Sequence, residues 1–157
     1  MVGNCFSLQK EFDVSIRYFQ RALQVDPTFV YAHTLYGHEL VNNEDLEKAQ
    51  RCFRTALLHD ERHYNAWYGL GSIYYRQEKF ELAEYNFRKA LSINSCSSVL
   101  KCFLSMVLSA QGLGGLGAHD EFDEDDHARE RKTKEALKIL AEAIAADPKN
   151  PQVHVIP

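Results

Sequence analysis

The amino-acid sequence repeats itself at a spacing of 34 residues, and this period constrains the fold more than any other feature. One glycine, one phenylalanine, one alanine and one leucine each recur three times at that spacing: Gly3/Gly37/Gly71, Phe19/Phe53/Phe87, Ala22/Ala56/Ala90 and Leu23/Leu57/Leu91. A period of roughly 20 to 50 residues is typical of proteins whose repeats bury their apolar faces against one another. The period therefore predicts a solenoid rather than one closed core.

Apolar and small residues lie at helical spacing within each repeat. The most complete set is Trp67, Leu70, Gly71, Tyr74, Ala83, Phe87 and Ala90. Small residues such as Gly71 and Ala83 allow two helices to approach closely, and the aromatic residues form their apolar faces. This is the tetratricopeptide pattern. It predicts an all-α solenoid of antiparallel helix pairs, wound as a right-handed superhelix, in which five aromatic residues are buried: Phe19, Phe53, Phe87, Trp67 and Tyr74.

The register of the columns divides the chain into repeats. The expected helix pairs are Met1–Leu8 (the end of a first helix) with Gln9–Gln24, Tyr31–Asn42 with Glu44–His59, Asn65–Gln77 with Lys79–Ile93, and Ser98–Gln111 with Thr133–Ala146. Asp26-Pro27 and Asp147-Pro148 mark helix ends, because proline disfavours helical geometry in the residue before it. Residues 1–111 thus hold repeats one to three and the first helix of repeat four. Residues 132–157 hold its second helix and the start of a fifth repeat.

A glycine-rich, acidic insert at 112–131 is expected to separate the two helices of repeat four. The run from Gly112 to Gly117 breaks helices, and six carboxylates lie between Asp120 and Asp126. High charge and little apolar content predict a mobile, solvated loop. The ligand order and central glycine of a calcium loop are missing, so no calcium site is predicted.

Composition excludes several classes of function. The net charge of −4 gives no sign of nucleic-acid binding, and no apolar run approaches the length of a membrane span. The four cysteines (Cys5, Cys52, Cys96 and Cys102) have no CxxC spacing and are expected to be reduced and packed. His59 and His63 have the spacing of a helical metal pair, but Asp60 stands where a metalloprotease needs glutamate. We therefore expect no metal, no cofactor and no enzymatic activity.

The first helix of each pair is expected to line a concave groove. The candidate peptide-binding residues are Asn4, Leu8, Thr34, His38, Glu39, Asn42, Asn65, Tyr68 and Tyr75. Amide, hydroxyl and aromatic groups together suit an extended peptide, since amides can bind its backbone and aromatic rings its side chains.

Chaperone adaptors of the same repeat class offer an alternative function. They clamp a terminal carboxylate with two lysines, two asparagines and an arginine. Asn4 matches one asparagine, but Leu35 replaces the second, and Asn65 and Gly69 replace the basic pair. The carboxylate clamp is therefore not supported, although a generic co-chaperone that binds a peptide tail stays as the alternative.

Longer stretches of sequence resemble one particular family. The runs are Gly3–Gln9, Phe19–Pro27, Tyr31–Glu39, His63–Gly71, Ile73–Phe80 and Ser97–Leu100. They are similar to the C-terminal repeats of the third subunit of the anaphase-promoting complex, over about Gly3–Leu100 and more loosely over Thr133–Pro148.

The resemblance implies a scaffold in a cell-cycle ubiquitin ligase of the nucleus and cytoplasm. In that family the groove receives C-terminal Ile-Arg tails of coactivators and of a core subunit. Here Glu39 and the groove amides would hold the arginine by charge-assisted hydrogen bonds. The resemblance also implies that the full-length protein can form homodimers through repeats outside this chain, and that its partners are proteins rather than nucleic acids or membranes.

Overall fold

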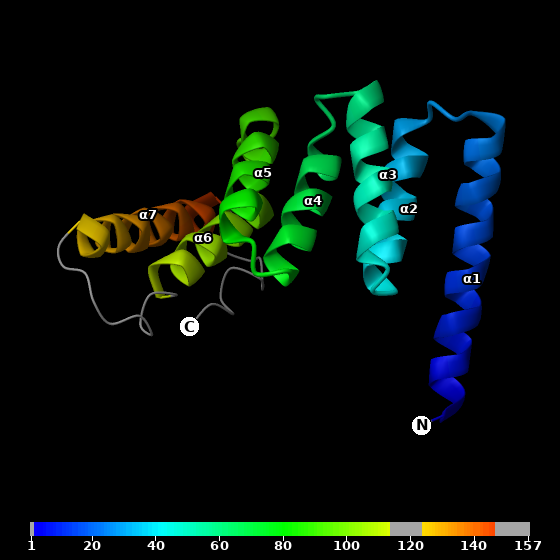
Figure 1. Cartoon of the computed structure of the whole chain (residues 1–157), viewed down its shortest axis with the longest axis horizontal. Coiled ribbons are helices and arrows are strands. Elements are labelled where there is room, and N and C mark those ends of the chain that lie inside the picture. Colours follow the sequence, from blue (N-terminus) through cyan, green and yellow to red (C-terminus); the bar gives the residue numbers. More distant parts are fainter. Residues whose placement is uncertain (1, 114–123, 147–157) are drawn as a thin grey trace. The chain divides into compact units, whose positions relative to one another are not determined.

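The computed structural model describes residues 2–113 and 124–146, and every regular element in these two ranges is an α-helix (Figure 1). The helices are α1 (Val2–Val25), α2 (Val30–Asn42), α3 (Leu46–His59), α4 (Tyr64–Arg76), α5 (Phe80–Ile93), α6 (Ser98–Leu113) and α7 (Glu124–Ala146). The chain forms two compact units, residues 1–73 and 74–157, and the division falls within α4. The all-α class predicted from the sequence is confirmed for the described residues.

Helices α2 to α5 lie within about two residues of the predicted spans, and their pairs are separated by the same kind of turn. Glu44 and Glu78, which are 34 residues apart, both have left-handed backbone geometry, with φ of 63° and 58°. In the first turn the Glu44 N–H donates to the Val41 carbonyl (3.1 Å) and the Asp45 N–H to the Leu40 carbonyl (2.9 Å). This pair of bonds is the Schellman motif, which satisfies the last carbonyls of a helix.

The predicted break between residues 8 and 9 is wrong, because α1 runs without interruption from Val2 to Val25. The position equivalent to Glu44 and Glu78 is Lys10, and it lies inside this helix. Gln9, Lys10 and Glu11 are all good helix formers, so nothing local forces a left-handed turn here. The first repeat therefore contributes one long helix rather than parts of two.

The phenylalanine columns form the core where the repeats are regular. In α3, the side chains of Ala49, Phe53 and Ala56 are 0% exposed, and Ala83, Phe87 and Ala90 of α5 are equally buried. The Phe53 ring lies against two glycines: a Cβ added at Gly37 would lie 2.7 Å from ring atom Cε1, and one at Gly69 would lie 2.3 Å from Cζ. In the second unit, the Phe87 ring stacks on Phe103 at 5.6 Å between centroids.

Two of the five predicted core aromatics are thus fully buried, and the prediction is wrong for the other three. Phe19, Trp67 and Tyr74 are only partly covered. Trp67 is amphipathic, and its indole N–H donates to the Glu61 carbonyl at 2.8 Å, which holds that edge of the ring near the surface. Phe19 lies in α1, whose main described contact is with α2.

Helices α6 and α7 pack side by side, and both extend into the segment that was predicted to be an insert. Helix α6 continues through Gly112 to Leu113, and α7 begins at Glu124, so the predicted limits of 112 and 131 are wrong. A Cβ at Gly112 would lie 2.7 Å from the Thr133 hydroxyl oxygen, so this glycine permits the close approach of α7. The charged residues 124–131 are mostly good helix formers, and acidic residues at a helix start favour the helix dipole. The rest of the predicted insert, 114–123, lies outside the described residues.

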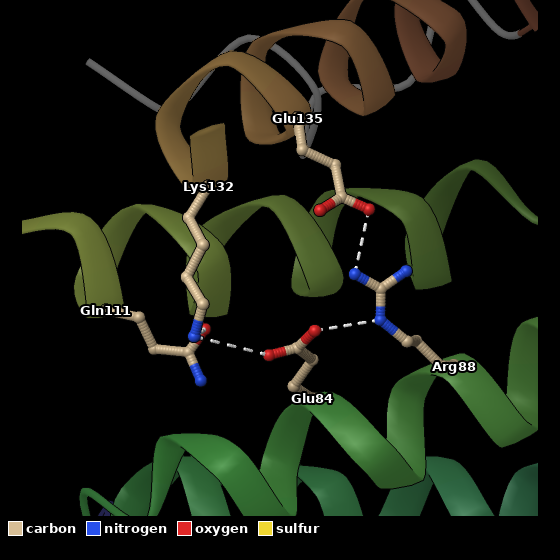
Figure 2. A network of polar contacts seen from close by, with 5 residues as sticks. All are labelled: Glu84, Arg88, Gln111, Lys132 and Glu135. Carbon is tan, nitrogen blue, oxygen red and sulfur yellow. Dashed lines mark hydrogen bonds and ion pairs between the residues drawn. The ribbon is translucent and has the colours of Figure 1, made fainter. Parts of the chain in front are cut away.

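Figure 2 shows a polar network that joins α7 to α5 and α6. Arg88 pairs with Glu84 and with Glu135, each at 2.8 Å. The Lys132 ammonium donates to the Gln111 amide oxygen at 2.9 Å and lies 3.8 Å from Glu84. A further pair joins Lys101 and Glu142 at 3.6 Å. The position of α7 therefore depends on ion pairs as well as on its two buried alanines, Ala136 and Ala143.

None of the helices in the described ranges is long and apolar enough to span a bilayer.

Candidate peptide-binding groove

Helices α2 and α4 position most of the predicted site residues of the first unit. His38, Glu39, Asn65 and Tyr68 are partly exposed, and Asn42 is exposed at the last turn of α2. These side chains are therefore open to a ligand to different degrees, with Asn42 the most accessible.

His38 lies at the centre of this group. Its imidazole centroid is 5.9 Å from the Tyr68 ring of α4 and 5.0 Å from the Phe53 ring of α3. Burial lowers the pKa of His38 below its usual value, and the nearby His63 lowers it further. The imidazole is therefore neutral near pH 7, and it offers a ring face and a hydrogen-bonding nitrogen rather than a positive charge.

One predicted residue, Thr34, does not join this group, and two others cannot be placed in it because their side chains are not described. Thr34 is only 2% exposed, and its hydroxyl donates to the Val30 carbonyl at 2.9 Å within α2, so it is closed to a ligand. Asn4 and Leu8 lie in the continuous helix α1, and their side chains fall outside the described set.

Tyr75 belongs to the second unit. Its ring is partly exposed and meets the Phe80 ring edge-on at 5.9 Å between centroids. It is held by the start of the next helix in its own repeat.

The structure adds residues that the site prediction did not include. Phe53 forms the support beneath His38, although the sequence identified it only as a core residue. The sequence pattern indicated His63 only as one half of a possible metal pair with His59. The His63 ring meets the exposed Tyr31 edge-on at 6.4 Å, and its Nε2 atom is buried without a hydrogen-bond partner among the described residues. The Phe53 ring leaves no room for a Cβ at position 69, which explains why glycine stands there in addition to Gly71 of the repeat pattern.

The two groove helices carry very little charge. Helix α2 contains Glu39, two histidines and no lysine or arginine, and α4 contains Arg76 as its only charged residue. Arg76 lies in the second unit, so the part of the groove in the first unit has one carboxylate and no permanently cationic side chain from these helices. This favours a cationic ligand group over an anionic one.

The described cysteine and histidine side chains form no second site. Burial raises the pKa of the Cys52 thiol to about 11, with a smaller contribution from Asp45, so Cys52 is protonated and unreactive near pH 7. His59 stacks on His33 at 6.2 Å, whereas His63 meets Tyr31, so the two histidines have different neighbours. Across residues 2–113 and 124–146, no three histidine, cysteine or acidic side chains lie close enough together to hold a metal ion.

Comparison with known proteins agrees with this architecture. Residues 34–95 match the tetratricopeptide-repeat family. The crystal structure of MamA superposes with a TM-score of 0.70 at 18% identity, covering 94% of this chain and 75% of that chain, which establishes the fold alone. The matched segment of the chain therefore carries tetratricopeptide repeats.

Its relatives by sequence are more specific. Cell division cycle protein 27 homolog B of Arabidopsis thaliana is 46% identical over 96% of this chain. Protein bimA of Emericella nidulans is 48% identical over 64% of the chain, and anaphase-promoting complex subunit 3 of Schizosaccharomyces pombe is 45% identical over 68%. The resemblance to the third subunit of that complex is thereby confirmed. The chain spans 18%, 12% and 16% of the length of these three relatives, respectively.

Proposed function

We propose that this chain is the peptide-capturing part of a scaffold subunit in an anaphase-promoting-complex ubiquitin ligase. Its groove binds C-terminal tails that end in Ile-Arg, from coactivators and from a core subunit. The protein works by binding and not by catalysis, in the nucleus and cytoplasm of dividing cells. Relatives that are named as a subunit of this complex support the assignment.

One observation carries the tail-binding proposal: within the first unit, α2 and α4 bring one carboxylate, Glu39, and no lysine or arginine, since Arg76 of α4 belongs to the second unit. A guanidinium finds a charge-assisted partner at Glu39. Asn42 and Asn65 supply amide groups for the peptide backbone, and the rings of His38 and Tyr68 supply an apolar surface. Because one short tail makes a small contact, its affinity is expected to be weak and to rise when several contacts are tethered.

The test is a titration of the chain into fluorescein-labelled peptides that differ only in their last residue. An Ile-Arg peptide is expected to bind at least about tenfold more tightly than an Ile-Ala peptide, since a hydrogen bond to a charged group contributes about 1.5–3 kcal/mol. Glu39→Gln removes the carboxylate and should reduce this preference. Glu47→Gln, in the first turn of α3, removes an exposed carboxylate outside α2 and α4 and serves as the matched control.

The alternative, a co-chaperone that clamps an acidic tail, predicts a different ranking of peptides. It requires tighter binding of a tail ending in Glu-Glu-Val-Asp than of one ending in Ile-Arg. Equal affinity for the Ile-Arg and Ile-Ala peptides would contradict tail capture while leaving the scaffold assignment standing.

A further inference from the structure

Helix α5 exposes two large apolar side chains on one face. Leu82 is 46% exposed and Tyr85 is 54% exposed, and residues three apart are neighbours on a helix surface. The Lys89 ammonium lies 5.7 Å from the centroid of the Tyr85 ring, one turn further along. Together, Leu82 and Tyr85 form the α5 ridge.

The equivalent positions of the other repeats show that the fold does not require an apolar ridge. The two positions hold Val14 and Arg17 in α1, Lys48 and Arg51 in α3, and Glu135 and Lys138 in α7. The tyrosine position is therefore basic in each of the other three helices. Single exposed apolar residues are ordinary. Two on one helix face, at positions that are charged in α3 and α7, indicate an interaction surface.

Acidic side chains border the ridge at its N-terminal end. Glu81, four residues before Tyr85, and Glu78, in the preceding turn, are both exposed. Neither carboxylate takes part in an ion pair with another described residue. The next carboxylate, Glu84, is already engaged by Arg88 and Lys132 (Figure 2). The ridge is therefore an apolar surface with two carboxylates available at one end.

We propose that the α5 ridge docks a segment of another protein that presents an aliphatic or aromatic anchor and, one helical turn away, an arginine or lysine. The anchor would cover Leu82 and Tyr85, and apolar anchors of this kind dominate interface energies. The cation would pair with Glu81, at the end of the ridge away from Lys89, whose ammonium already lies over the Tyr85 ring. The site lies on α5, which carries none of the groove residues, so it is independent of tail capture.

The experiment measures fluorescence anisotropy with two labelled alanine-based helical peptides. Both carry two leucines on one face. The first has arginine one turn from the leucines, and the second has glutamate at that place. The variant is Leu82→Lys with Tyr85→Arg, which introduces the residues that α3 carries at these positions and is therefore compatible with the helix. The control is Leu58→Lys, which removes the 85% exposed leucine of α3.

The basic peptide is expected to bind about tenfold more tightly than the acidic one, and the double variant should lose about tenfold in affinity. The Leu58→Lys control should bind as the unchanged chain does. Circular dichroism of each variant checks that the helices are retained. The proposal is overturned if the double variant binds the basic peptide normally, if the Leu58 control loses as much, or if sedimentation shows that the ridge instead joins two copies of this chain.

Discussion

Helices α3 and α7 are both second helices of their repeats, yet they are held in place by different interactions. In α3, three buried residues meet the surrounding helices, and the Phe53 ring fills the space left by Gly37 and Gly69. In α7, Leu140 stands at the phenylalanine position and is only partly buried, against Cys102 and Ala143. Buried Ala136 and Ala143 and ion pairs to Arg88, Lys101 and Glu84 supply further contacts. Packing around one aromatic ring therefore specifies α3, whereas smaller side chains and a polar network together hold α7.

The largest effect should come from emptying the α3 core. Phe53→Ala is expected to reduce the free energy of unfolding by about 3–5 kcal/mol, the usual range for removal of a buried aromatic ring. Leu140→Ala should cost less than half as much, because this side chain is already partly exposed. Urea denaturation followed by circular dichroism measures both. Equal losses would remove the distinction between the two helices.

Gly69→Ala tests the same core by adding side-chain volume instead of removing it. The added methyl group would lie 2.3 Å from a Phe53 ring atom, so the ring or the helix must move. Overpacking of this kind costs about 1–3 kcal/mol, measured by the same denaturation. Phe53→Leu combined with Gly69→Ala provides the control, since the smaller side chain should restore part of the loss. A neutral Gly69→Ala substitution would show that the contact is not tight.

The network of α7 should contribute less and should depend on salt. Arg88→Ala breaks the pairs to Glu84 and Glu135, but the Arg88 side chain is 43% exposed. Partly exposed pairs contribute roughly 0–1 kcal/mol and are screened by salt. Amide hydrogen exchange in α7 should therefore accelerate in the variant at low salt, and the difference should shrink in high salt. Acceleration of the same size in α3 would indicate general destabilisation instead.

The smallest expected effect is a dependence of stability on pH through His38. Its pKa is lower in the folded chain than in the unfolded chain, so only the unfolded chain gains a proton as pH falls below about 6.5. Stability is thus fully present above that pH and declines as pH falls towards the folded pKa. The melting temperature of His38→Gln should fall less between pH 7 and pH 5 than that of the unchanged chain. An equal fall in the two chains would show that His38 does not contribute to the pH dependence.

The sequence predicted the regular repeats well because their signals are local and periodic. The 34-residue columns located α2 to α5 within about two residues, and they identified Phe53 and Phe87 as core. The predictions were wrong where structure depends on a partner or on a missing signal. Lys10 continues α1 because no residue near it requires a left-handed turn, and Gly112 is a packing position because Thr133 lies against it.

The candidate site was predictable only in part. Spacing assigned His38 and Tyr68 to neighbouring helices, and the two rings do lie 5.9 Å apart. Spacing could not show that the Thr34 hydroxyl is used by the Val30 carbonyl, because threonine in a helix can either face solvent or bond to the preceding turn. The contact of His63 with Tyr31 joins a loop to a helix start, and no period in the sequence relates them.

Tail capture requires that a cationic peptide bind to the face of the chain that α2 and α4 form. This binding can be followed by nuclear magnetic resonance of the isotopically labelled chain during titration with a peptide ending in Ile-Arg. Signals of the Asn42 and Asn65 side-chain amides and of the Tyr68 backbone are expected to shift with the Ile-Arg peptide and much less with an Ile-Ala peptide. Shifts that are confined to other helices, or that are the same for both peptides, would show that these helices do not capture the tail.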